Sequence, residues 1–125
     1  EYNQAIRLKK DYYVAFNNRG MAKYANDDYE GAKIDFTEAI KIKRDYAFAL
    51  NNRASAKLRL EQYKSAIDDC NAAIKFNPEY GYAFYNRGIA NEMMRDLDAA
   101  CSDWERAASM GVEIAAEYKR ITCNQ

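Results

Sequence analysis

The residues of this chain that could do chemistry recur as one short motif. An Asn-Arg-small triplet ends each of the stretches NNRG (17–20), NNRA (51–54) and YNRG (85–88), and successive stretches start 34 residues apart. A side-chain amide carries a hydrogen-bond donor and an acceptor, and a guanidinium is a fork that matches a carboxylate. The motif therefore predicts polar binding by the Asn residues and ion pairing by the Arg residues.

Catalytic and metal chemistry have little support in the sequence. The chain contains no histidine, which removes His-based general bases and the usual Ser-His and Cys-His nucleophile pairs. The cysteines, Cys70, Cys101 and Cys123, have no CxxC spacing, and no Gly-rich phosphate loop is present. We expect no catalytic residue, no bound metal and no cofactor. We expect the cysteines to be buried, unreactive thiols rather than a disulfide framework.

The charge balance gives no reason to expect nucleic acid or membrane partners. Lys and Arg total 19 and Asp and Glu total 19, and an RNA-binding array would need a basic groove. No apolar run is long enough to span a bilayer, and the first residues lack the apolar segment of a signal peptide. We favour a cytoplasmic location. Secretion or a periplasmic location stays open, because a leader removed earlier leaves no trace.

The elements that must position the triplets follow from the period of the sequence. Residues 12–45, 46–79 and 80–113 align without a gap, which is the signature of a repeat architecture. The columns identical in all three units are Tyr12, Tyr46 and Tyr80; Ala15, Ala49 and Ala83; Asn18, Asn52 and Asn86; Arg19, Arg53 and Arg87; Ala22, Ala56 and Ala90; Ala32, Ala66 and Ala100; Asp35, Asp69 and Asp103; and Ala39, Ala73 and Ala107.

Each unit is predicted to form two antiparallel helices. In the first unit, apolar and small residues recur at helical spacing from about residue 13 to 25 and from about residue 29 to 43. The polar stretch 26–28 separates them, and Asp28 can cap the second helix. The stretches 60–62 and 95–96 separate the helices of the other units, and Pro78 ends a helix. One unit cannot bury its apolar face alone, so stacking of units must supply the core.

The two ends of the chain depart from the complete repeat. Residues 1–11 align with the end of a unit, which predicts the second helix of a truncated repeat and a fragment of a longer array. We expect this end to fray before Asp11 or to associate with another copy. Residues 112–122 are amphipathic and are predicted to cap the last unit. The residues expected to face inward are Tyr2, Ala5 and Ile6 at one end and Ile114, Ala115, Tyr118 and Ile121 at the other.

The chain resembles a tetratricopeptide repeat array, whose pattern is W-x2-L-G-x2-Y, then A-x3-F, then P. The matching positions are Phe16, Arg19, Gly20, Lys23, Ala32, Phe36 and Arg44 in unit one; Leu50, Arg53, Ala54, Lys57, Ala66, Cys70 and Pro78 in unit two; and Phe84, Arg87, Gly88, Asn91, Ala100, Trp104 and Val112 in unit three. Arg replaces the usual Leu, and Lys or Asn replaces the usual Tyr.

The resemblance implies an all-α fold in a single domain, residues 1–125. This is a right-handed superhelix of antiparallel helix pairs, with three full repeats, a leading half-repeat and a C-terminal capping helix. Together these elements should give about eight helices and no sheet.

The resemblance also implies a function. In this family the first helices line a concave groove, and the chain is expected to be a protein–protein interaction scaffold that binds an extended peptide there. Side-chain amides can pair with peptide backbone of any sequence. The implied binding residues are Asn17, Asn18, Met21, Phe48, Asn51, Asn52, Ser55, Arg59, Tyr82, Tyr85, Asn86 and Ile89. Within this set, Asn18, Asn52 and Asn86 form the expected Asn ladder.

The Arg residues are expected to be structural instead. Arg19, Arg53 and Arg87 occupy the inward Leu position and should pair with Asp35, Asp69 and Asp103 on the second helices. An alternative reading of the whole chain is a self-association module of a larger protein, with no separate peptide ligand.

One ligand class fits poorly. A subclass of these repeats holds a terminal carboxylate with Lys, Asn and Arg. The corresponding positions here are Asn17, Met21, Asn52, Tyr82 and Asn86, and only Asn52 matches. The sequence therefore argues against an acidic C-terminal peptide of the chaperone type.

Overall fold

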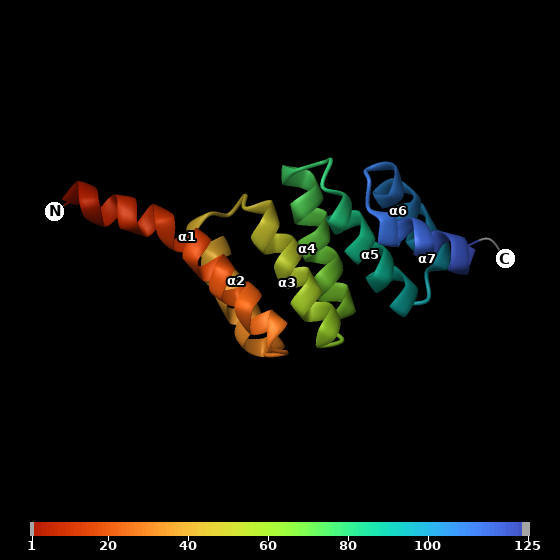
Figure 1. The fold of residues 1–125 in the computed structure, drawn as a ribbon, viewed down its shortest axis with the longest axis horizontal. Coiled ribbons are helices and arrows are strands. Elements are labelled where there is room, and N and C mark those ends of the chain that lie inside the picture. Colours follow the sequence, from red (N-terminus) through yellow and green to blue (C-terminus); the bar gives the residue numbers. More distant parts are fainter. Residues whose placement is uncertain (1, 124–125) are drawn as a thin grey trace.

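The computed structural model describes the backbone of residues 2–123 and the side chains of residues 12–123. Within this range the chain forms helices and no strand, and Figure 1 shows successive antiparallel pairs stacked in a row from the N-terminus to the C-terminus. The all-α superhelix that the family resemblance implies is confirmed. The helices are α1 (Tyr2–Ala25), α2 (Tyr29–Ile42), α3 (Ala47–Arg59), α4 (Tyr63–Phe76), α5 (Gly81–Met93), α6 (Leu97–Ser109) and α7 (Glu113–Cys123).

The helices end where the polar breaks predict. Asp28 caps α2 by accepting a hydrogen bond of 2.9 Å from the Gly31 amide, and Asp96 caps α6 in the same way from Ala99. The stretch 60–62 separates α3 from α4, and α4 stops at Phe76, before Asn77 and Pro78. These caps satisfy amides that have no partner inside the helix.

The turn inside each unit has the same backbone conformation. Asp27, Glu61 and Arg95 occupy equivalent positions and have positive φ angles of 64°, 61° and 66°. The amide of the following residue donates to the carbonyl five residues back at 2.8 Å in all three turns, from Asp28 to Lys23, from Gln62 to Lys57 and from Asp96 to Asn91. This is the Schellman arrangement, in which a left-handed residue ends a helix, and it is a position that favours glycine.

The N-terminal helix differs from the prediction. Residues 2–25 form one continuous helix of 24 residues, so no turn separates residues 1–11 from the first repeat, and the described chain has seven helices rather than eight. The segment KKDYY (9–13) contains no Pro or Gly, and each added residue of a growing helix gains a hydrogen bond. The first part of α1 therefore projects beyond the other helices (Figure 1). The side chains of Tyr2, Ala5 and Ile6, which were expected to face inward, lie outside the described residues.

The capping helix is present as α7, with one correction to its inward face. Ala115 is fully buried and Tyr118 is half-buried, as expected, but Ile114 and Ile121 are 46% and 59% exposed. Ile114 and Ile121 lie seven residues apart, so they share one flank of the helix, next to Tyr118 and further from the line of Ala115.

The cysteines also differ from the prediction. Cys70 is buried and free, as expected, but Cys101 and Cys123 form a disulfide. They are 22 residues apart in sequence, and their Cα atoms are 5.9 Å apart because α7 folds back along α6. The bond joins the last residue of α7 to the second helix of the third repeat.

Side-chain size is matched across each helix pair. Gly20 faces Phe36 and Gly88 faces Trp104, so closely that a β-carbon on either glycine would overlap the ring. In the second unit the same positions hold Ala54 and Cys70, which are both fully buried in one cluster. A large residue on the second helix thus accompanies a glycine on the first helix, and a small one accompanies an alanine.

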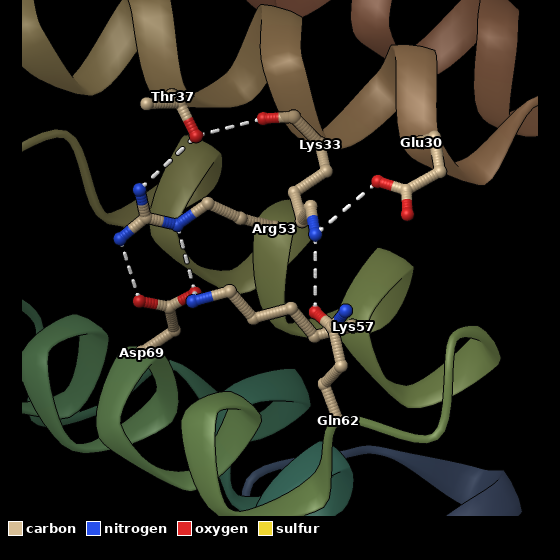
Figure 2. A network of polar contacts seen from close by, with 7 residues as sticks. All are labelled: Glu30, Lys33, Thr37, Arg53, Lys57, Gln62 and Asp69. Carbon is tan, nitrogen blue, oxygen red and sulfur yellow. Dashed lines mark hydrogen bonds and ion pairs between the residues drawn. The ribbon is translucent and has the colours of Figure 1, made fainter.

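The predicted Arg–Asp pairs form in all three units. Arg53 donates to both carboxylate oxygens of Asp69 at 2.8 and 2.7 Å, and Lys57 lies 2.8 Å from the same carboxylate (Figure 2). The pairs of Arg19 with Asp35 and Arg87 with Asp103 have the same two-bond geometry. The three carboxylates are buried. In each unit, the Arg that replaces the family's Leu and the Lys or Asn that replaces its Tyr contact the same Asp.

The same arginines connect neighbouring units. Arg53 donates to the Thr37 hydroxyl of the preceding unit at 3.2 Å, as Figure 2 shows, and Arg87 donates to the Asn71 carbonyl at 2.9 Å. Thr37 and Asn71 are equivalent residues of α2 and α4. Each of these arginines therefore holds its own helix pair together and also contacts the pair before it.

Candidate functional site

The first helices of the units, α1, α3 and α5, contact one another in order and form one face of the array. This face contains two adjoining pockets, of about 140 Å³ and about 330 Å³, which share Tyr24 and Ser55. We call the two pockets together the groove. The small pocket is lined by Met21, Tyr24, Phe36, Asn52 and Ser55. The large pocket is lined by Tyr24, Ser55, Leu58, Arg59, Tyr63, Tyr85, Asn86, Ile89, Met93 and Tyr118.

The residues expected to bind peptide fall into two groups. Met21, Asn52, Ser55, Arg59, Tyr85, Asn86 and Ile89 line the groove. The others do not line either pocket: Asn17 and Asn51 are buried, Asn18 is exposed, and Phe48 and Tyr82 are 56% and 54% exposed. The groove thus includes only part of the predicted set of residues, and it extends further toward α7 than that set does.

Two residues of the expected Asn ladder, Asn52 and Asn86, bond to the preceding unit, but to Asn17 and Asn51 rather than to each other. The Asn52 amino group donates to the Asn17 carbonyl at 3.0 Å, and the Asn86 amino group donates to the Asn51 carbonyl at 2.8 Å. Asn86 also donates to the Ser55 hydroxyl at 3.0 Å. These bonds join residues 35 positions apart. The NN doublets therefore link α1 to α3 and α3 to α5 at the base of the groove.

A row of aromatic rings runs from the middle of α1 to the N-terminal ends of α3 and α5. Tyr13 contacts Tyr46, Tyr46 contacts Phe48, and Phe48 contacts Tyr80, all edge to face with ring centres 4.9–5.9 Å apart. The Tyr80 hydroxyl also meets the Asn51 amino group at 3.3 Å. This row lies outside the two pockets and supports the edge of the face that carries them.

The groove carries little charge. Among the described residues that line it, Arg59 is the charged one. Arg59 donates to the Tyr24 hydroxyl at 3.3 Å, and its guanidinium stands over the Tyr29 ring at 5.6 Å. At the other wall, burial and the neighbouring Tyr118 hydroxyl raise the pKa of the Tyr85 phenol above its usual range, so this hydroxyl stays protonated. The groove offers neutral hydroxyls, amides and aromatic faces rather than an ion-binding site.

Two further kinds of site have no counterpart in the described part of the chain. No cluster of three or more His, Cys, Asp or Glu side chains there could hold a metal ion. None of the helices in the described range combines the length and the apolar character needed to cross a membrane.

The list of implied binding residues omits six residues of the groove: Tyr24, Phe36, Leu58, Tyr63, Met93 and Tyr118. Tyr24 and Leu58 are equivalent residues that lie three positions after Met21 and Ser55, so helical spacing alone could have found them. Tyr118 had been assigned only to the cap. Its place in the groove depends on how α7 packs, which no spacing within a repeat reveals.

Family models identify the repeats. The tetratricopeptide repeat is matched by two models, at residues 13–46 and at residues 47–80, and together they span more than half of the chain. The chain belongs to the tetratricopeptide repeat family. Domains of this family are generally interaction modules without catalytic activity. No curated protein matches this chain in sequence.

Solved tetratricopeptide repeat domains have the same fold. The first such domain of Spaghetti (RPAP3), bound to the HSP90 peptide SRMEEVD, is 26% identical, with a TM-score of 0.85 over 89% of this chain and 90% of that one. The second domain of human RPAP3, in complex with the HSP70 peptide SGPTIEEVD, is 26% identical, with a TM-score of 0.85 over 94% and 99%. The Arabidopsis OM64 domain is 26% identical, with a TM-score of 0.84 over 90% and 97%.

Proposed function

We propose that this tetratricopeptide repeat array is a scaffold that binds an extended peptide segment of a partner protein in the groove. The observation that carries this proposal is the pair of adjoining pockets along α1, α3 and α5, lined by aromatic, amide and hydroxyl groups. Similar domains of RPAP3 are bound to HSP90 and HSP70 peptides. Binding rather than catalysis is supported by the buried carboxylates, each of which is already paired with an arginine.

The Asn ladder is the finer part of this proposal. Asn52 and Asn86 donate through their amino groups to Asn17 and Asn51, so their carbonyl oxygens can accept from the backbone N–H groups of a peptide. The internal bonds fix the orientation of both amides before a ligand arrives, which lowers the entropic cost of binding. Tyr24, Tyr85 and Tyr118 would then contact the apolar side chains of the ligand.

The ligand is proposed to differ from the acidic peptides of the RPAP3 domains. Asn17, Met21, Tyr82 and Asn86 are uncharged and do not match the Lys, Asn and Arg set of the carboxylate clamp. A terminal carboxylate would therefore meet no cation there. We expect a neutral or weakly acidic segment, with apolar side chains for the two pockets and at most one carboxylate near Arg59.

Selection from a displayed library of random peptides tests the site. Peptides that bind the wild-type chain should lose at least tenfold in affinity for Ser55→Trp, which fills the junction of the pockets. Ser102→Trp, at an exposed position of α6, is the matched control and should bind normally. The peptide SRMEEVD should bind weakly or not at all. Equal affinity for wild type and Ser55→Trp would show that the groove is not the site.

Self-association is the second candidate, and one observation favours it. Ala49 and Ala83 are fully buried, whereas the equivalent Ala15 is exposed beside Tyr12, Phe16 and Arg19, around a hollow of about 220 Å³. We propose that a second copy covers this face of α1. Sedimentation over a concentration series should then show a dimer that Ala15→Arg abolishes. One species of monomer mass at every concentration would contradict it.

A further inference from the structure

The disulfide joins two elements that contribute differently to the groove. Cys101 lies in the second turn of α6, on the body of the third repeat, and Cys123 is the last residue of α7. Both cysteines are half-buried, so a small or protein reductant can approach them. Cys70 is fully buried in a different unit and takes no part in this pair.

Helix α7 forms one wall of the large pocket through a single side chain. The Tyr118 ring stands edge to face against Tyr85, with ring centres 5.4 Å apart, and against Trp104, at 5.3 Å. Tyr85 and Tyr118 both line the large pocket, and Trp104 lies behind them in the core. The shape of the large pocket therefore depends on α7 staying against α5 and α6.

The C-terminal half of α7 packs less deeply on the array than the N-terminal end of the helix does. Val112 and Ala115 are buried and fix its N-terminal end. Beyond Tyr118, Lys119 reaches only the exposed Glu105, at 3.8 Å, and Arg120 pairs with Glu117 on the surface of the same helix. Exposed ion pairs contribute little, and a helix of 11 residues is marginal by itself. The disulfide is therefore the covalent restraint on this half of α7, beside the packing of Tyr118 and Cys123 on the core of the third repeat.

We propose that the Cys101–Cys123 disulfide controls the large pocket: when it is reduced, the C-terminal half of α7 leaves the array and Tyr118 no longer closes the groove. The reductant is a dithiol. One of its thiolates attacks a disulfide sulfur, its second thiol resolves the mixed disulfide, and Cys101 and Cys123 gain two electrons and two protons as the dithiol becomes a disulfide. The consequence for ligand affinity rests on the proposed peptide-binding function, whereas the release of α7 does not.

The proposal connects the groove to the redox state of its surroundings. Disulfides persist in secreted and periplasmic proteins and are reduced in the cytosol. In an oxidising compartment, α7 is expected to stay on the array and close the large pocket. Among reduced thiols, the C-terminal half of α7 is expected to be released. The same chain would present two different large pockets in these two places.

Trp104 provides a direct readout, because it is the only tryptophan of the chain and contacts Tyr118. Hydrogen exchange and Trp fluorescence are measured on the intact chain with and without dithiothreitol. On reduction, amides of residues 119–123 should exchange at least tenfold faster and the Trp emission should shift to the red, with exchange in α3 and α4 unchanged. Cys123→Ser should resemble the reduced wild type and should not respond to dithiothreitol.

Two further measurements decide the outcome. Tyr118→Ala keeps the disulfide and removes the wall, so it should match the reduced chain in fluorescence but keep slow exchange in α7. Peptides selected on the oxidised chain should bind the reduced chain at least fivefold more weakly. Unchanged exchange and fluorescence after full reduction would overturn the proposal, and so would equal peptide affinity in both states. If no peptide binds either form, the peptide-binding function fails, and the exchange result still decides whether α7 is released.

Discussion

Arg53 and Asp69 form an ion pair with two hydrogen bonds, of 2.8 and 2.7 Å, between the two helices of the second repeat. Asp69 is buried, so Arg53→Ala leaves a carboxylate with Lys57 as its remaining cation. Loss of one partner of a buried pair costs about 3 kcal/mol, and we expect a loss of this order in the free energy of unfolding measured with urea. The double variant Arg53→Leu with Asp69→Ala should recover much of it.

Arg19→Ala is the control for this prediction. Arg19 makes the same two bonds to Asp35, but its side chain is 60% exposed, against 20% for Arg53. Water can replace an exposed partner more easily, so the loss should be clearly smaller. If Arg53→Ala unfolds like the wild type while peptide binding is lost, the arginines belong to the site and the structural assignment is wrong.

Glu61→Gly should stabilise the chain. Glu61 has a φ of 61° in the turn between α3 and α4, a conformation that costs an L-residue roughly 1–2 kcal/mol and that glycine adopts freely. Part of this gain is lost to the greater freedom of glycine in the unfolded chain, so we expect a net gain of about 0.5–1 kcal/mol by thermal or urea unfolding. Glu61→Ala keeps the β-carbon and should give no comparable gain. An equal gain from both variants would contradict the backbone explanation.

Gly88→Ala should destabilise the third repeat. A β-carbon at this position would overlap the Trp104 indole nitrogen, which donates to the Tyr85 carbonyl at 3.3 Å. Overpacking of this kind costs about 1–3 kcal/mol. The Trp104 fluorescence should shift at the same time, because the ring must move. Ala54→Gly, at the equivalent position beside Cys70, opens space instead and should leave that fluorescence unchanged. A wild-type melting temperature for Gly88→Ala would contradict the close contact.

Cys70 should resist alkylation in the folded chain. Burial is the main cause that raises the pKa of its thiol to about 12, so at pH 8 the group is protonated as well as inaccessible. Iodoacetamide should therefore label no cysteine of the oxidised native chain and two of the reduced chain, Cys101 and Cys123, as counted by mass spectrometry. Labelling of Cys70 without denaturant would show that the second repeat opens readily.

The repeat period predicted the parts of the structure that are the same in every unit. Asp28 as a cap, the helix end before Pro78 and the Arg–Asp pairs all follow from residues that recur with the 34-residue spacing, because equivalent residues occupy equivalent places. The alignment of the three units also shows that a glycine on the first helix accompanies a large residue, Phe36 or Trp104, on the second helix.

Contacts that do not obey the period could not be predicted in this way. The disulfide forms because α7 folds back on α6. The separation of 22 residues between the two cysteines does not predict that packing. The continuity of α1 follows from a local property, the lack of Pro or Gly in residues 9–13, and not from the period. The amides of Asn52 and Asn86 bond 35 residues back rather than 34, so comparison within one column did not reveal that their partners are Asn17 and Asn51.

The contacts of Arg53 and Arg87 with the preceding unit repeat by translation along the chain, since Thr37 and Asn71 are equivalent residues. A second copy of residues 46–79 inserted after residue 79 would therefore meet compatible neighbours at both of its junctions. The array would lengthen by one helix pair and the groove by one first helix, with the same superhelical pitch. Affinity for a longer peptide could then be increased by duplication alone, without the design of a new interface.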